Sequence, residues 1–186
     1  MARLRLVRHG QAAAGWGDDH DPGLSALGLE QAAAAAGGVG LGSDDPLPSI
    51  LSSPLRRARE TAAAFSEALG TPARIDAAFG EIPSPSTGLA ERDAWLRAAL
   101  VGTWSDLDSS VAAWRSSLLG AIRALRGDTV VVTHFVAINA VVGAAAGSDL
   151  VTTFLPANAS ITTVVVDPDG SIAVEALGSE APPVIS

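Results

Sequence analysis

Short apolar runs alternate with longer segments of mixed polarity along the whole chain. Four such runs predict short strands, at residues 2–7, 49–51, 73–75 and 129–133, of which the last is expected to be buried. The segments between and after them predict helices, at residues 25–36, 53–69, 88–100, 109–126 and 135–146. The final stretch, SITTVVVDPDGSIAVEAL at residues 160–177, predicts a hairpin that turns at DPDG.

Residues typical of helix ends support these boundaries. Ser25 is expected to cap the first helix, which stops at Gly37. The second helix is expected to begin with Ser53 as its N-cap and Pro54 at its first position, and to end at Gly70.

Strands that alternate with helices predict an α/β fold, a three-layer α/β/α sandwich around a mostly parallel central sheet. Ligands of such sheets bind beyond the carboxyl ends of the strands. Three groups of polar residues fall there: Arg8-His9 after the first strand, Ser52-Ser53 after the second, and His134 after the strand at 129–133. We expect them to converge on one site.

Composition places the chain among soluble globular proteins. Its 186 residues are 48% hydrophobic, and no linker-like stretch divides them, so we expect one domain over residues 1–186. There is no cysteine, which excludes disulfides and thiolate metal sites. Three arginines interrupt the apolar N-terminus, which therefore lacks the pattern of a signal peptide. We expect a cytoplasmic protein with no membrane span.

The charge pattern excludes one class of partner and favours another. A formal net charge of −8 argues against nucleic-acid binding, which needs a basic face. Every basic residue is arginine, so an anion must be held by Arg, His or backbone N–H groups. Several cations in one pocket repel each other unless an anion joins them. A phosphoryl group, with about two negative charges, matches guanidinium donors well.

Five blocks of sequence, in this order, resemble the histidine phosphatase superfamily, branch 1, the phosphoglycerate mutase-like group. They are LVRHGQ, DPGLSALGLEQA, SSPLRRARETA, GEI and VVVTHFVAINAVV, and the resemblance extends from about residue 4 to about residue 165. The tripeptide RHG alone is weak evidence, but the ordered set is specific. The chain departs from many members in lacking a GES-type motif after the GEI block.

The resemblance implies a set of site residues. His9 would be the nucleophile that accepts the phosphoryl group, and Glu81 would be the proton donor. Arg8, Arg57 and His134 would bind the phosphoryl oxygens. It implies no metal or other cofactor, and a cap over the pocket at about residues 82–108.

The chemistry sets two conditions on His9. It must be neutral to attack phosphorus, and neighbouring Arg8 and Arg57 should lower its pKa. Its other ring nitrogen needs an acceptor that fixes the tautomer, for which a nearby backbone carbonyl is the usual group.

Ordinary structural roles compete with functional ones at several other positions. Arg56 and Arg59 are expected to be solvated helix residues, and the acidic loop around His20 a polar turn rather than a metal site. Trp95 and Trp104 are expected to anchor the cap inside the protein, although they could instead line an apolar cleft.

The function predicted from these residues is hydrolysis of phosphate monoesters of small molecules through a phosphohistidine, without a metal. Three alternatives stay open. The first is a phosphoglycerate mutase-type transferase, which usually needs a longer and more basic cap. The second is a phosphatase that removes phosphate from protein phosphohistidine. The third is a binding module that recognises phosphorylated ligands without catalysis.

Overall fold

The computed structural model describes residues 1–15, 17–39 and 47–181. The strands are β1 (Ala2–Arg8), β2 (Ser49–Ser52), β3 (Ala73–Ile75), β4 (Thr129–Thr133), β5 (Ile161–Val166) and β6 (Ile172–Ala176). The α-helices are α1 (Ala26–Gly37), α2 (Arg56–Leu69), α3 (Leu89–Leu100), α4 (Ser109–Ala124) and α5 (Phe135–Ala146). Two short 3₁₀ helices complete the chain, η1 (Ala77–Phe79) and η2 (Trp104–Asp106).

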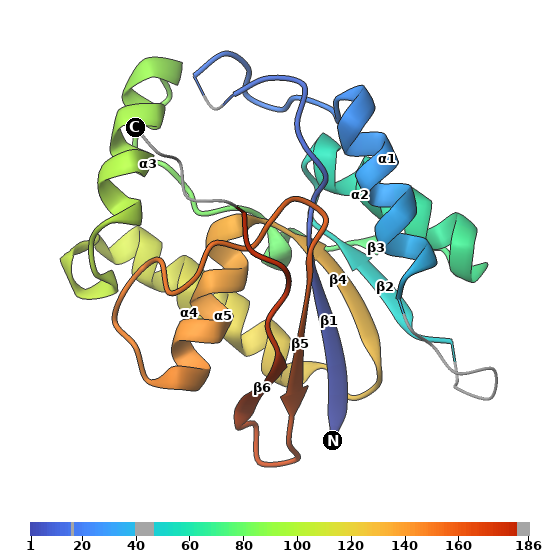
Figure 1. The fold of residues 1–186 in the computed structure, drawn as a ribbon. Coiled ribbons are helices and arrows are strands. Elements are labelled where there is room, and N and C mark those ends of the chain that lie inside the picture. The colour runs from blue at the N-terminus through green and yellow to red at the C-terminus, as the bar shows by residue number, and fades with distance from the viewer. Residues whose placement is uncertain (16, 40–46, 182–186) are drawn as a thin grey trace.

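One six-stranded sheet, in the order β3-β2-β4-β1-β5-β6, organises these elements (Figure 1). The pairs from β3 to β1 are parallel, whereas β5 and β6 pair antiparallel at the other edge. The predicted α/β fold with a mostly parallel sheet is confirmed, and so is the C-terminal hairpin.

Strand register decides which residues leave the sheet together. Arg8 pairs with Thr133 between β1 and β4, and Ser52 pairs with Val132 between β2 and β4. Because the three strands run in the same direction, the next residue of each one emerges at the same edge of the sheet. These residues are His9, Ser53 and His134.

Alternating side chains of the strands build an apolar core on each face of the sheet. Val130 and Val132 pack with Phe65 of α2, whereas Val131, between them, packs with residues of α4 and α5. Figure 1 shows α1 and α2 on one side of the sheet and α4 and α5 on the other. The result is the expected three-layer α/β/α sandwich.

The helix ends agree with the sequence at most positions and differ at one. The Ser25 side chain accepts a hydrogen bond from Gly28 N–H, and Gly70 ends α2 in the left-handed region at φ 62°. The predicted start of the second helix is wrong, because α2 begins at Arg56, and Pro54 lies in the turn before it. The Ser53 hydroxyl does accept Leu55 N–H, but its other contact is with a histidine ring.

The chain passes unusually close to α1 directly after His9. A Cβ atom added to Gly10 would lie 2.3 Å from the backbone oxygen of Gly28. One added to Gly28 would lie 2.1 Å from the backbone oxygen of Gln11. Both positions therefore need glycine, and this contact supports the segment that carries His9.

No helix in the described part of the chain is long and apolar enough to cross a membrane.

The close approach predicts that Gly28→Ala destabilises the protein, whereas Gly37→Ala does not. Gly28→Ala should lower the free energy of unfolding by about 1–3 kcal/mol, because the new methyl group overlaps the Gln11 carbonyl. Gly37 ends the same helix with no atom within 4 Å of an added Cβ, so its substitution should change stability by less than about 1 kcal/mol. Urea unfolding measures both, and equal stabilities would contradict the prediction.

Candidate active site

Two histidine rings meet where β1 and β4 end. The ring centroids of His9 and His134 lie 5.1 Å apart, with the rings inclined by 62° in an edge-to-face arrangement. His9 is 7% exposed and His134 is fully buried. The register of the sheet brings these residues together, as the sequence predicts.

Both nitrogens of His9 are hydrogen-bonded, and together the bonds define its protonation state. Nδ1 lies 2.7 Å from the backbone oxygen of Gly10, which can only accept, so Nδ1 carries the proton. Nε2 lies 3.1 Å from the Nε–H group of Arg57, which can only donate. His9 is therefore a neutral ring with its lone pair on Nε2. Burial, and next the charges of Arg57 and Arg8, lower its pKa to about 3.

Arg57, in the first turn of α2, points inward and is 2% exposed. Its Nη2 atom is buried without a hydrogen-bond partner among the described residues. Its Nη1 atom lies 4.0 Å from Oδ1 of Asp21, too far for a strong ion pair. Burial lowers the pKa of Arg57, although Glu81 and Asp21 oppose the effect. The guanidinium thus keeps donors for an incoming anion.

Arg8, the last residue of β1, supplies a second guanidinium. Its Nη1 group donates to the backbone oxygen of Pro156 at 2.7 Å, and its Cζ atom lies 5.3 Å from the centroid of the Phe135 ring. Its Nε atom is buried and has no partner within the described chain. Burial lowers the pKa of Arg8 as well. These contacts hold the side chain in place and leave its Nε–H group as a donor for an anion.

Glu81, two residues after η1, supplies a carboxyl group beside these histidine and arginine side chains. It is half-buried, and its Oε1 atom accepts the backbone N–H of Ile82 at 3.0 Å. Burial raises the pKa of Glu81, because it disfavours the carboxylate more than Arg57 and Arg8 stabilise it. The same burial therefore favours a neutral base at His9 and a protonated acid at Glu81.

A cavity of about 440 Å³ opens in front of these groups, lined by Arg8, His9, Arg57 and Glu81. Phe135 and Asn158 line it too, and α3 contributes Asp93 and Arg97. His134 is fully buried and is not part of the lining. A second cavity, lined by His20 and Arg92 among others, shares Glu81 as a common wall.

Two arginines and two tryptophans take the structural roles expected of them. Arg56 and Arg59 are exposed on α2, and Trp104 is buried against Trp114. Trp95 packs against the core, and neither Trp95 nor Trp104 lines the cavity at His9. No group of three or more potential metal ligands lies together in the described ranges, including the loop at His20.

The contacts of four residues in this region carry no signal in the sequence. Asp93 and Arg97 form an i,i+4 ion pair that resembles any solvated helix pair. Asn158 lies in an irregular loop. Ser53 was expected as a helix cap near the converging strand ends, but the sequence assigned it no contact with a histidine ring. Only the tertiary structure brings them to the two histidines and the cavity.

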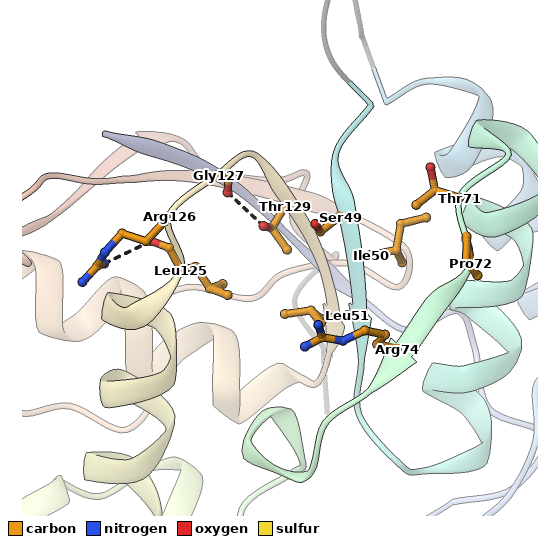
Figure 2. Close-up of a pocket in the computed structure, with 10 residues that line it drawn as sticks. All are labelled: Ser49, Ile50, Leu51, Thr71, Pro72, Arg74, Leu125, Arg126, Gly127 and Thr129. Carbon is orange, nitrogen blue, oxygen red and sulfur yellow. Dashed lines mark hydrogen bonds between the residues drawn. The ribbon is translucent and has the colours of Figure 1, made fainter.

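Another cleft, of about 290 Å³, lies at the opposite end of the parallel strands, where β2, β3 and β4 begin (Figure 2). Its two arginines are Arg74 and Arg126. Arg126 donates to the backbone oxygens of Arg123 and Leu125, and Thr129 donates to Gly127. No histidine or carboxylate stands among the described residues that line this cleft, so they offer neither a general base nor a general acid.

Comparison with known families agrees with this geometry. The sequence model of the histidine phosphatase superfamily (branch 1) matches residues 4–177. The chain belongs to this superfamily. A search of curated proteins gave no significant match.

Solved structures of the same phosphoglycerate mutase-like fold are similar over nearly the whole chain. A mycobacterial glucosyl-3-phosphoglycerate phosphatase, solved in complex with VO3, is 28% identical with a TM-score of 0.68, covering 98% of this chain and 100% of that one. The protein named mycobacterial hydrolase 1 is 27% identical with a TM-score of 0.71, covering 97% and 99%. A phosphoserine phosphatase from Entamoeba histolytica is 22% identical with a TM-score of 0.74, covering 96% and 98%, which shows the shared fold.

The depressed pKa of His9 predicts a loss of stability in mild acid. The unfolded chain takes up a proton at this residue below about pH 6.5, whereas the folded protein resists doing so down to about pH 3. The titration of His9 therefore leaves the stability unchanged above pH 6.5. At pH 5 it lowers the free energy of unfolding by about 2 kcal/mol.

In His9→Gln this titration is removed, so less stability should be lost between pH 7.5 and pH 5 than in the wild type. The low pKa of His134 acts in the same direction in both proteins. Urea unfolding at the two pH values tests the prediction, and equal losses would show that His9 does not stay neutral.

Proposed function

We propose that this protein is a metal-independent phosphatase that hydrolyses phosphate monoesters through a phosphohistidine on His9. One observation carries the proposal: the neutral His9 ring keeps its lone pair on Nε2 beside buried, unpartnered donors of Arg57 and Arg8 in the described chain. A dianionic phosphoryl group is what such an arrangement binds best. The phosphatases among the structural neighbours support the same reaction class.

In the first step the phosphoryl group transfers to His9. The lone pair of Nε2 attacks phosphorus, and the bond between phosphorus and the ester oxygen breaks. In the structure this lone pair accepts a hydrogen bond from Nε–H of Arg57. A phosphoryl oxygen must therefore accept that hydrogen bond in its place before Nε2 can attack. Glu81 gives its proton to the departing oxygen, and the arginines stabilise charge on the equatorial oxygens.

In the second step water removes the phosphoryl group. Glu81, now a carboxylate, takes a proton from a water molecule that attacks phosphorus, and the phosphorus–nitrogen bond breaks. Inorganic phosphate leaves, and His9 returns to its neutral form. The Nδ1 proton stays on the hydrogen bond to Gly10 throughout, so the ring is never required to carry two protons.

We assign segment 82–108 to a cap that shapes the leaving-group side of the cavity. Its α3 helix contributes Asp93 and Arg97, and the cavity has room for a phosphate with a small leaving group. Arg97 is paired with Asp93 at 2.8 Å and is 74% exposed on its side chain. This pairing makes it a poor ligand for the second phosphate that a mutase must hold, which favours hydrolysis over transfer.

Trapping the intermediate tests the proposal directly. We expect a rapid alkaline quench during turnover of p-nitrophenyl phosphate to give protein with an added phosphoryl mass that acid removes. His9→Ala should lose the adduct and reduce kcat by about 10³-fold or more. His20→Ala, which changes an exposed histidine outside the catalytic group, should keep the adduct. Turnover without an adduct on His9 would refute covalent catalysis.

The role of Glu81 predicts a dependence on the leaving group. In Glu81→Gln, kcat/KM for an alkyl phosphate such as 2-glycerophosphate should fall by about 10²–10³-fold, because an alkoxide leaves poorly without a proton. For p-nitrophenyl phosphate the loss should be about tenfold or less, because nitrophenolate needs little protonation. The two substrates serve as controls for each other. Because kcat/KM reports only the steps up to phosphoryl transfer, a role of Glu81 in the later hydrolysis does not affect the comparison. Equal losses for both would exclude Glu81 as the acid.

A further inference from the structure

The turn between β2 and α2 carries two buried hydroxyl groups with different partners. The Ser53 hydroxyl oxygen lies 2.7 Å from Nε2 of His134. The neighbouring Ser52 hydroxyl donates to the backbone oxygen of Ser53, and within the described chain it forms no hydrogen bond with the ring. Ser52, Ser53 and His134 are all fully buried, so the contact is closed to water.

The direction of the hydrogen bond between Ser53 and His134 follows from its other contact. The Ser53 oxygen already accepts Leu55 N–H at 3.2 Å, and its single proton needs an acceptor. Among the described residues, Nε2 of His134 is the only hydrogen-bond partner of the Ser53 hydroxyl that can accept this proton. The hydroxyl therefore donates to Nε2, and the ring proton of neutral His134 lies on Nδ1.

The opposite arrangement would leave two groups unsatisfied. If Nε2 carried the proton and donated to Ser53, the hydroxyl proton would have no acceptor in the described part of the chain. Nδ1, which is buried without a partner there, would then present a lone pair instead of a proton. A lone pair repels the oxygens of a phosphoryl group, whereas an N–H group binds them.

We propose that Ser53 is a positioning residue that holds His134 as the neutral Nδ1–H tautomer, ready to donate to a phosphoryl oxygen on His9. This inference rests on the proposed function and deepens it. The ring centroids of His134 and His9 lie 5.1 Å apart, and no hydrogen-bond partner in the described chain occupies Nδ1 of His134. A neutral donor adds a hydrogen bond without placing a third positive charge beside Arg8 and Arg57.

Burial supports the neutral state of His134. The pKa of His134 lies well below its usual value because of burial first, and then because of His9, Arg57, Arg8 and Arg92. Ser53 also blocks the nitrogen at which a second proton would bind. The serine thus fixes both the charge and the tautomer of the ring.

Nitrogen-15 NMR of the histidine rings tests the tautomer without any reference to activity. In the wild type we expect His134 to show a protonated Nδ1 and an unprotonated Nε2, and inorganic phosphate to shift the Nδ1 signal. In Ser53→Ala the ring should lose this exclusive tautomer, whereas in Ser52→Ala it should keep it. A wild-type ring protonated on Nε2 would overturn the proposal.

Kinetics provide the second measurement, with Ser52→Ala as the matched control. In Ser53→Ala, kcat should fall by about 10- to 100-fold with a smaller change in KM, because the donor matters most when charge develops on the phosphoryl oxygens. Ser52→Ala should stay within about threefold of the wild type, since it removes a buried hydroxyl from the same turn but no contact to the ring.

The outcomes separate this inference from the proposed function. If the wild type turns over phosphate esters and the two serine variants are equally active, the role of Ser53 is refuted and the function stands. If the wild type hydrolyses no ester, the proposed function fails, whatever the ring spectrum shows. If Ser53→Ala does not fold, the wild-type ring spectrum and its response to phosphate still decide.

Discussion

The parallel pairing of β1, β4 and β2 is the constraint on which the rest of the candidate site depends. In-register hydrogen bonds place Arg8 level with Thr133, and Ser52 level with Val132. The residue after each strand end then emerges at one edge, which puts His9, His134 and Ser53 within contact. A register shift of one residue would turn these side chains to the other face of the sheet. The apolar cores on both faces oppose such a shift, because every strand residue would exchange its environment.

Burial is the second organising effect, and it acts in opposite directions on the base and the acid. It lowers the pKa of His9 to about 3, so near neutral pH the ring has a free lone pair, and it raises the pKa of Glu81, so this carboxyl group keeps its proton to a higher pH than an ordinary glutamate. Two guanidinium groups, the buried Arg57 and the half-buried Arg8, lie beside them in a chain of net charge −8. The charge of the whole protein therefore says little about the site, because the local potential comes from a few cations in a region of low dielectric constant.

Much of the fold follows from local pattern, and the differences have tertiary causes. The alternation of short apolar runs and helical segments predicted the three-layer sandwich and the hairpin, both of which are confirmed. The start of α2 was wrong, because local rules assigned Ser53 to a helix cap and Pro54 to the first turn. In the structure the Ser53 hydroxyl contacts His134, 81 residues away, and the helix begins at Arg56. No local rule contains a contact of that range.

The sequence by itself determined the candidate groups: two histidines at strand ends, an arginine beside one of them, and an Arg-rich helix start that resembles a known family. It could indicate Arg57 over Arg56 and Arg59 only through that resemblance. The tertiary structure separates the three physically, since helix phase buries Arg57 against His9 and leaves the other two exposed. It also decided the hydrogen bonds that assign a tautomer to each ring, and it brought Asp93, Arg97 and Asn158 to the cavity. Side-chain type and strand position are local properties, whereas burial and hydrogen-bond partners exist only once distant segments pack together.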